Sequence, residues 1–149
     1  MNLTKPLQGL KAQFGTFGRS ARLFLLATIM DGILFSGWNL FFNFYILGRG
    51  FERDYLGLVN AMPSIAALIF GIPLGALSDR IGRKPAMILG VAISIAGMAL
   101  EVTVLDPTLI LVFAFIQGLG STLYYLSQAP FMMKVSNDDN RALLFSLNW

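Results

Sequence analysis

The sequence contains no cysteine and no histidine among its 149 residues. Without cysteine the chain cannot form a disulfide framework or a thiolate–zinc site, and without histidine it cannot form a Ser-His-Asp triad or a histidine-based metal centre. The apolar segments also contain no paired carboxylates and no nucleophile–base arrangement. We therefore expect no enzyme activity, no metal site and no cofactor.

Charged residues are scarce as well. Asp, Glu, Lys and Arg make up 13% of the sequence, whereas 56% of it is hydrophobic. A soluble domain of this size carries about 25% charged residues because it must cover its surface with polar groups. A lipid bilayer removes that need, so the composition predicts an integral membrane protein. We read the net charge of +3 as a sign of membrane orientation and expect no nucleic-acid partner.

Four long apolar runs follow an N-terminal segment of residues 1–20. The runs cover approximately residues 22–47, 55–77, 86–104 and 108–133, and a fifth covers 142–149, where we expect it to be incomplete. Each of the four can cross a hydrocarbon core of about 30 Å as a helix, and none alternates apolar with polar residues as a membrane strand does. Short connections make consecutive helices antiparallel neighbours. The sequence thus predicts an all-α, polytopic transmembrane helix bundle.

Basic residues lie mainly on one side of this predicted topology. That side carries Lys5, Lys11, Arg19, Arg22, Arg80, Arg83, Lys84, Lys134 and Arg141. The other side carries Arg49 and Arg53. Cytoplasmic loops carry an excess of Lys and Arg, so we expect a cytoplasmic N-terminus. The expected location is the cell membrane, specifically the inner or plasma membrane of a prokaryote.

The N-terminal segment has two interpretations. Leu7, Leu10, Phe14 and Phe17 have helical spacing, which is typical of a segment that lies along the membrane surface. The alternative is a partly disordered cytoplasmic lead.

Small residues recur four apart on two of the predicted helices. The second carries Ala67, Gly71 and Gly75, and the third carries Ala86, Gly90 and Ser94. Lipid gives no hydrophobic drive for helix association, so close backbone approach through small residues must supply the packing. Both rows therefore predict helix–helix contacts.

The connection between the second and third helices reads Gly75-Ala76-Leu77-Ser78-Asp79-Arg80-Ile81-Gly82-Arg83-Lys84, which we call the 75–84 motif. Here the chain resembles the major facilitator superfamily of secondary transporters, whose signature loop follows the pattern G-x-L-a-D-r-x-G-r-k. The matching residues are Gly75, Leu77, Asp79, Arg80, Gly82, Arg83 and Lys84. Ser78 stands where an alanine is usual. The resemblance implies a fold of two six-helix halves, of which residues 21–149 would form the first four helices and the start of the fifth.

The residue types of the motif have physical reasons. Gly75 permits close helix contact, and Gly82 permits a tight turn with a backbone angle that other residues resist. Asp79 can pair with an arginine or with a helix N-terminus. The resemblance implies that this loop latches the cytoplasmic side closed when the transporter opens outward. The plainer interpretation is positive-inside charge combined with a tight turn.

A second family pattern, R-x-x-q-G-x-g, falls on the fourth helix. Gln117, Gly118 and Gly120 agree with it, but Ala114 stands where the arginine belongs. In proton-coupled drug antiporters of the family that arginine is associated with proton transfer. Its absence weakens the case for that coupling route and leaves the coupling ion open.

The resemblance also implies that the first and fourth helices line a substrate cavity. The polar and aromatic candidates are Asp31, Trp38, Asn39 and Asn43 on the first helix, with Gln117, Ser121, Tyr124 and Gln128 on the fourth. Within each helix these side chains follow helical spacing. Two such stripes would bind an uncharged or amphipathic organic solute by stacking and hydrogen bonds. Asn39 and Asn43 have a second interpretation, hydrogen bonds to neighbouring helices.

Two carboxyl groups lie within the predicted membrane helices. Asp31 indicates a cation or proton site, because a buried acid in a membrane helix is costly. Its alternative is a structural role, in which it reaches the cytoplasmic interface or pairs with an arginine. Glu101 lies near the outer end of the third helix, and we expect it at the membrane interface.

The sequence therefore favours a secondary or facilitative transporter that moves a small organic solute by alternating access, with efflux preferred over uptake. The expected partners are the lipid bilayer, a small molecule of unknown identity, and the C-terminal helices of a longer transporter. The alternative is a four-helix membrane scaffold or partner subunit that transports nothing.

Overall fold

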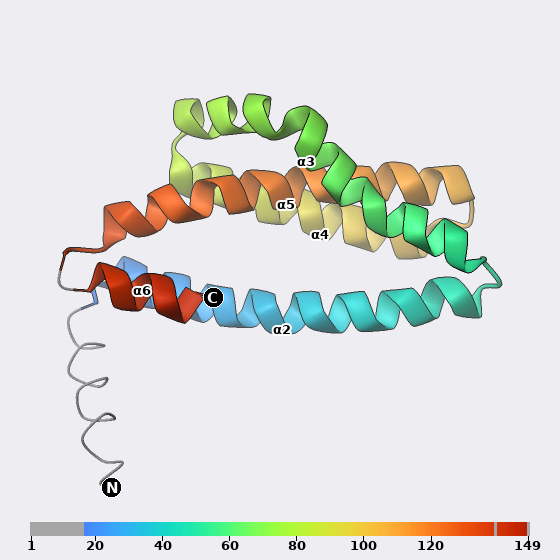
Figure 1. Cartoon of the computed structure of the whole chain (residues 1–149), viewed down its shortest axis with the longest axis horizontal. Helices are drawn as coiled ribbons and strands as arrows, with labels where there is room; N and C mark the ends of the chain where they lie inside the picture. The colour runs from blue at the N-terminus through green and yellow to red at the C-terminus, as the bar shows by residue number, and fades with distance from the viewer. Residues whose placement is uncertain (1–16, 139, 149) are drawn as a thin grey trace, which may run out of the picture. The chain divides into compact units, whose positions relative to one another are not determined.

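The computed structural model describes residues 17–138 and 140–148. All regular secondary structure in these residues is helical. The helices are α2 (Arg19–Gly48), α3 (Arg53–Ile81), α4 (Arg83–Thr103), α5 (Pro107–Val135) and α6 (Arg141–Asn148), labelled in Figure 1. The expected amphipathic or disordered lead falls mostly in residues 1–16, which lie outside the described residues.

Four of these helices, α2 to α5, are long and apolar enough to cross a membrane. The shortest, α4, has 21 residues and at about 1.5 Å per residue spans about 30 Å. The predicted all-α membrane fold is thereby confirmed. The second helix extends to Ile81 and not to residue 77 as expected, because the helix continues beyond the apolar stretch into its charged flank.

The chain divides into two compact units, one made of Met1–Trp38 and Met132–Trp149, the other of Asn39–Phe131. In the first unit, α6 approaches α2 through a hydrogen bond from Thr28 Oγ1 to Asn148 Oδ1 of 3.4 Å. Leu144 is fully buried there. The turn before α6 is closed by Asn140 Oδ1, which accepts the backbone N–H of Asn137 at 2.9 Å.

In the second unit, α3 and α4 are joined by a tight turn at Gly82. Its φ of +91° lies in the region that residues with a Cβ avoid. Its N–H donates to the Ser78 carbonyl at 3.0 Å and closes the last turn of α3, while its own carbonyl accepts the Ala86 N–H at 3.0 Å. One residue thus ends one helix and starts the next. The sequence predicted the tight turn at Gly82, but it placed a longer connection between helices of residues 55–77 and 86–104.

Helix α3 is visibly bent along its length (Figure 1). Pro63 and Pro73 both lie inside it. Each removes a backbone donor and crowds the carbonyl one turn earlier, which is the usual cause of such a bend. The bend separates the first half of α3 from the second half, whose last residues form the start of the 75–84 motif.

Helices α4 and α5 pack with their backbones in close contact. A Cβ placed on Gly90 would lie 2.6 Å from the Gly120 carbonyl oxygen, and one on Gly120 would lie 2.5 Å from the Ser94 nitrogen. A Cβ on Gly97 would lie 2.8 Å from Gln117 Cβ. Such distances leave no room for a side chain. The small residues of α4 therefore make the helix contact that their spacing predicted.

The first half of α3 packs against α5 in the same way. A Cβ on Gly118 would overlap Pro63 Cα and would lie 3.1 Å from Ala66 Cβ. By contrast, a Cβ on Gly71 or Gly75 would meet nothing within 4 Å among the described residues.

Three side chains stabilise the end of this unit opposite the 75–84 motif. From α2, the Tyr45 hydroxyl donates to the Val102 carbonyl at 2.7 Å and Arg49 Nη1 donates to the Val104 carbonyl at 2.8 Å. From α3, the Tyr55 hydroxyl donates to the Pro107 carbonyl at 2.7 Å. The carbonyls at the end of α4 lack hydrogen-bond partners within the helix, so Tyr45 and Arg49 supply such partners. Tyr55 connects α3 to the first residue of α5.

Candidate functional site

The 75–84 motif is held by the side chain of Arg83. One guanidinium nitrogen pairs with the carboxylate of Asp79, which lies four residues earlier in α3, before the turn at Gly82. The other donates to Ser78 Oγ at 3.0 Å. Ser78 is fully buried, whereas 63% of the Asp79 side chain is exposed. The arginine thus joins a buried hydroxyl and an exposed carboxylate.

Ser78 also connects the motif to α5. Its Oγ lies 2.7 Å from Ser127 Oγ, and Ser127 Oγ donates to the Leu123 carbonyl at 2.7 Å. A hydroxyl has one hydrogen to donate. Since Ser127 gives its hydrogen to Leu123, Ser78 must be the donor in the serine pair. The hydrogen bonds therefore run in one direction, from the Arg83 guanidinium through Ser78 and Ser127 to a backbone carbonyl of α5.

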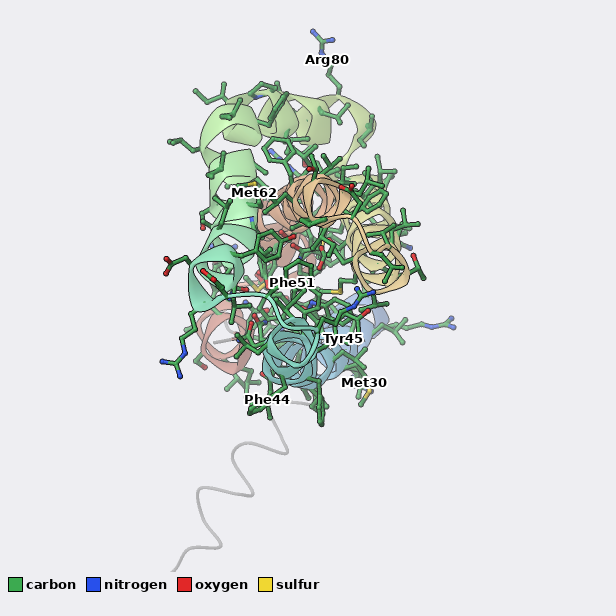
Figure 2. The ribbon with its side chains drawn as sticks, turned by 90° about the vertical axis from the view of Figure 1, so that its right-hand side faces the viewer. Met30, Phe44, Tyr45, Phe51, Met62 and Arg80 are labelled. Atoms are coloured by element: carbon green, nitrogen blue, oxygen red, sulfur yellow. The ribbon has the colours of Figure 1, made fainter. Side chains whose placement is uncertain are left out.

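The other charged residues of the motif point outward. Arg80 extends away from the helices in Figure 2 and is exposed, as is Lys84. Leu77 is 37% exposed. A Cβ on Gly75 would meet nothing within 4 Å among the described residues.

On α5, the residues of the R-x-x-q-G-x-g pattern have a packing role that the sequence did not reveal. Its two glycines face different helices, Gly118 toward Pro63 of α3 and Gly120 toward Gly90 and Ser94 of α4. Ala114, in place of the family arginine, is 2% exposed. A long charged side chain at that position would require a different arrangement of the surrounding helices.

The polar stripe of α5 is partly enclosed. Gln117 and Tyr124 are buried, and the Gln117 backbone carbonyl accepts the Ser94 hydroxyl of α4 at 3.3 Å. Ser121 and Gln128 are half-buried. The Ser121 hydroxyl donates to the Gly118 carbonyl of its own helix at 3.1 Å. A role for these four side chains in substrate binding stays a prediction.

On α2, Asn43 contacts a neighbouring helix. Its Oδ1 accepts the Nδ2 of Asn60 in α3 at 3.2 Å, which agrees with the structural alternative for this residue. Asn39 and Trp38 are half-buried. Trp38 and Asn39 fall on either side of the boundary between the two units, and their place in a substrate pathway stays a prediction.

Asp31 is half-buried in the unit that contains the start of α2. No hydrogen bond or ion pair to its carboxyl group is found within residues 17–138 and 140–148. The alternative in which it pairs with a structural arginine therefore has no support in the described part of the chain.

Sequence reasoning missed Ser127 and Asn60, the partners of Ser78 and Asn43. Asn60 is a polar residue between apolar neighbours, and Ser127 stands beside Gln128 within the fourth apolar run. Polar residues in membrane helices often form interhelical hydrogen bonds. That signal was available, but it does not indicate which helix supplies the partner.

The sequence and this geometry can be compared with known proteins. The family model described as Major Facilitator Superfamily matches residues 23–148. The chain belongs to the major facilitator superfamily. The 75–84 motif, with its turn at Gly82 and its Arg83–Asp79 pair, thus lies in the connection where the family has its signature.

Similar curated proteins include several that are named multidrug resistance protein MdtH. The protein from Salmonella paratyphi C is 34% identical over 103 residues, 69% of this chain and 26% of its own length. The one from Yersinia enterocolitica is 28% identical over 98 residues, 66% of this chain and 24% of its own length. The chain therefore spans about a quarter of the relatives it matches. No solved structure matches it significantly.

Proposed function

We propose that this chain forms the first helices of a secondary transporter that exports small organic solutes by alternating access. Family membership and relatives named for multidrug resistance support this function. The observation that carries it is the bonded 75–84 motif, in which Arg83 joins an exposed carboxylate to a hydrogen-bonded chain that ends on α5. In this proposal the polar stripes of α2 and α5 line the solute pathway.

The motif supplies what a latch between two half-domains needs. Its internal bonds hold α3, the turn and α5 together, so that they move as one body when the transporter rocks. The Arg83 pair occupies one oxygen of Asp79 and leaves other acceptor positions of an exposed carboxylate for a partner in the second half. Breaking the contact between Asp79 and that partner would release the latched state.

Transport by the complete protein tests this function. In drug-sensitive bacteria, the wild-type transporter should lower the accumulation of ethidium or tetraphenylphosphonium. Asp79→Asn should reduce that effect, because a neutral amide binds the arginine and any cationic partner less strongly than a carboxylate does. Asp54→Asn, the same substitution at an exposed carboxylate outside the motif, is the matched control. A complete protein that inserts normally but moves neither dye would support the non-transporting scaffold instead.

We further propose that the N-terminus and the 75–84 motif face the cytoplasm. The wild-type chain has no cysteine, so single-cysteine variants label without background from it. Glu52→Cys should react with a membrane-impermeant maleimide in intact cells, and Lys84→Cys should react only after permeabilisation. Both positions are exposed, so a difference reports the side of the membrane. The reverse pattern would place the motif outside.

A further inference from the structure

Asn43 and Asn60 form a hydrogen-bonded pair of side-chain amides between α2 and α3. Asn60 Nδ2 donates to Asn43 Oδ1 at 3.2 Å, and this bond lies at an exposed position. Asn60 is exposed and Asn43 is half-buried. Both residues lie within helices that can cross a membrane. The proposed solute pathway includes Asn43 and gives no role to Asn60.

The pair uses only part of its hydrogen-bonding capacity. A side-chain amide has two N–H donors and a carbonyl oxygen with two lone pairs. The bond between the amides takes one hydrogen of Asn60 and one lone pair of Asn43. No other hydrogen bond of either side chain is found within residues 17–138 and 140–148. The Nδ2 hydrogens of Asn43 and the Oδ1 oxygen of Asn60 therefore remain for a third group.

The neighbours of Asn60 on α3 leave its amide accessible. Val59 is buried, which places Asn60 at the edge of the packed face of the helix. Gly57 and Ser64 lie three residues before and four residues after Asn60, so they share its side of the helix. Both are exposed, and a Cβ on Gly57 would meet nothing within 4 Å among the described residues. Small side chains thus leave room for a small molecule beside Asn60.

The amide groups that remain need a polar partner. Apolar residues precede and follow both Asn43 and Asn60 in the sequence, and an amide without hydrogen bonds in apolar surroundings costs free energy. The bond between the two amides fixes their relative position, so the remaining donor and acceptor are preorganised for one ligand group. Asn43 belongs to the α2 stripe that the proposed function places on the solute pathway, which favours the solute as that partner.

We propose that Asn43 and Asn60 together form a binding subsite for an uncharged amide or a similar group of the solute. The solute offers a carbonyl oxygen to Asn43 and an N–H or O–H group to Asn60. This subsite rests on the proposed function and deepens it, because it names a class of solute and adds α3 to the pathway. Neither side chain is charged, so the subsite selects solutes by hydrogen bonds and not by their charge.

Two probes of different chemistry test the subsite in the complete transporter. Chloramphenicol is uncharged and carries an amide and hydroxyl groups, whereas tetraphenylphosphonium has no hydrogen-bonding group. Asn60→Leu keeps a side chain of similar size and removes its hydrogen bonds. We expect the KM of chloramphenicol efflux to rise about tenfold, the effect of one lost hydrogen bond, while the KM of tetraphenylphosphonium stays unchanged.

Asn43→Leu should discriminate between the two probes in the same way. Thr103→Val, which removes an exposed hydroxyl at the end of α4, is the control and should change neither KM. An unchanged KM for chloramphenicol in folded Asn60→Leu would overturn the subsite. An equal rise for both probes would also overturn it, because the pair would then act only by holding α2 and α3 together.

Cysteine labelling tests the subsite without a transport measurement and without Asn60→Leu. In a complete transporter that has no other cysteine, Asn60→Cys should react with a small hydrophilic thiol reagent, and chloramphenicol should slow that reaction. A thiol that the reagent does not reach would show that lipid or another helix covers Asn60, which would overturn the subsite. A wild-type protein that moves neither probe, although chloramphenicol protects Asn60→Cys, would count against the proposed function alone.

Discussion

Two rows of small residues with the same spacing behave differently in this chain. In α4, a side chain at Gly90 would collide with the backbone of α5, and Ser94 approaches Gly120 equally closely. In the second half of α3, Gly71 and Gly75 face open space among the described residues. A small residue every fourth position thus marks a surface that permits close approach, but it does not say whether the partner lies within the same chain.

The difference has a simple interpretation under the proposed function. The α4 row builds the bundle itself, whereas the α3 row is available to helices outside this chain. The chain spans about a quarter of its relatives, so we propose that those helices belong to the second half of the transporter. The contacts that α3 does make use other residues, namely Pro63 with Gly118, Ser78 with Ser127, and Asn60 with Asn43.

The largest expected effect is at the α4–α5 contact. Gly90→Leu should lower the free energy of unfolding by about 3 kcal/mol, the upper range for overpacking, because its side chain meets backbone atoms that cannot move aside. Gly57→Leu in α3 is the control, since a Cβ there meets nothing within 4 Å. Unfolding of the transporter in detergent measures both. Equal stabilities would show that α4 and α5 do not pack closely at Gly90.

A smaller effect is expected where the motif meets α5. Ser78→Ala and Ser127→Ala each remove one member of the hydrogen-bonded chain, and each should cost about 1 kcal/mol. The double variant should cost less than the sum, because the same hydrogen bond is lost only once. A double-mutant cycle on unfolding free energies checks this expectation. Additive costs would mean that the two hydroxyls do not interact.

The smallest effect is expected at the contact between α2 and α3. Asn60→Ala should destabilise the protein by about 0.6 kcal/mol, the average for a hydrogen bond between membrane helices. Asn43→Ala should have the same effect and should not add to it. If Asn43→Ala instead impairs transport while stability is unchanged, Asn43 belongs to the solute pathway and its contact with Asn60 is secondary.

The helices could be predicted from the sequence because each is a long apolar run bounded by charged or turn residues. The turn at Gly82 was also predictable, since few other residues adopt its backbone angle. The contacts between helices were not. A row such as Gly71 and Gly75 shows which face can be approached, but the rotation and register of each helix decide what approaches it. Glu101 is only 3% exposed, which the sequence did not predict, because distance from a helix end says nothing about which neighbours cover a side chain. Its expected position at the membrane interface stays a prediction.

The most direct test compares Gly71→Leu with Gly90→Leu in the complete transporter and measures ethidium efflux per amount of folded protein. The account predicts that Gly71→Leu leaves the amount of folded protein unchanged and abolishes efflux, because the α3 row must approach the second half during the cycle. Gly90→Leu should instead reduce the amount of folded protein. Wild-type efflux in Gly71→Leu would contradict the account and would indicate that the α3 row faces lipid.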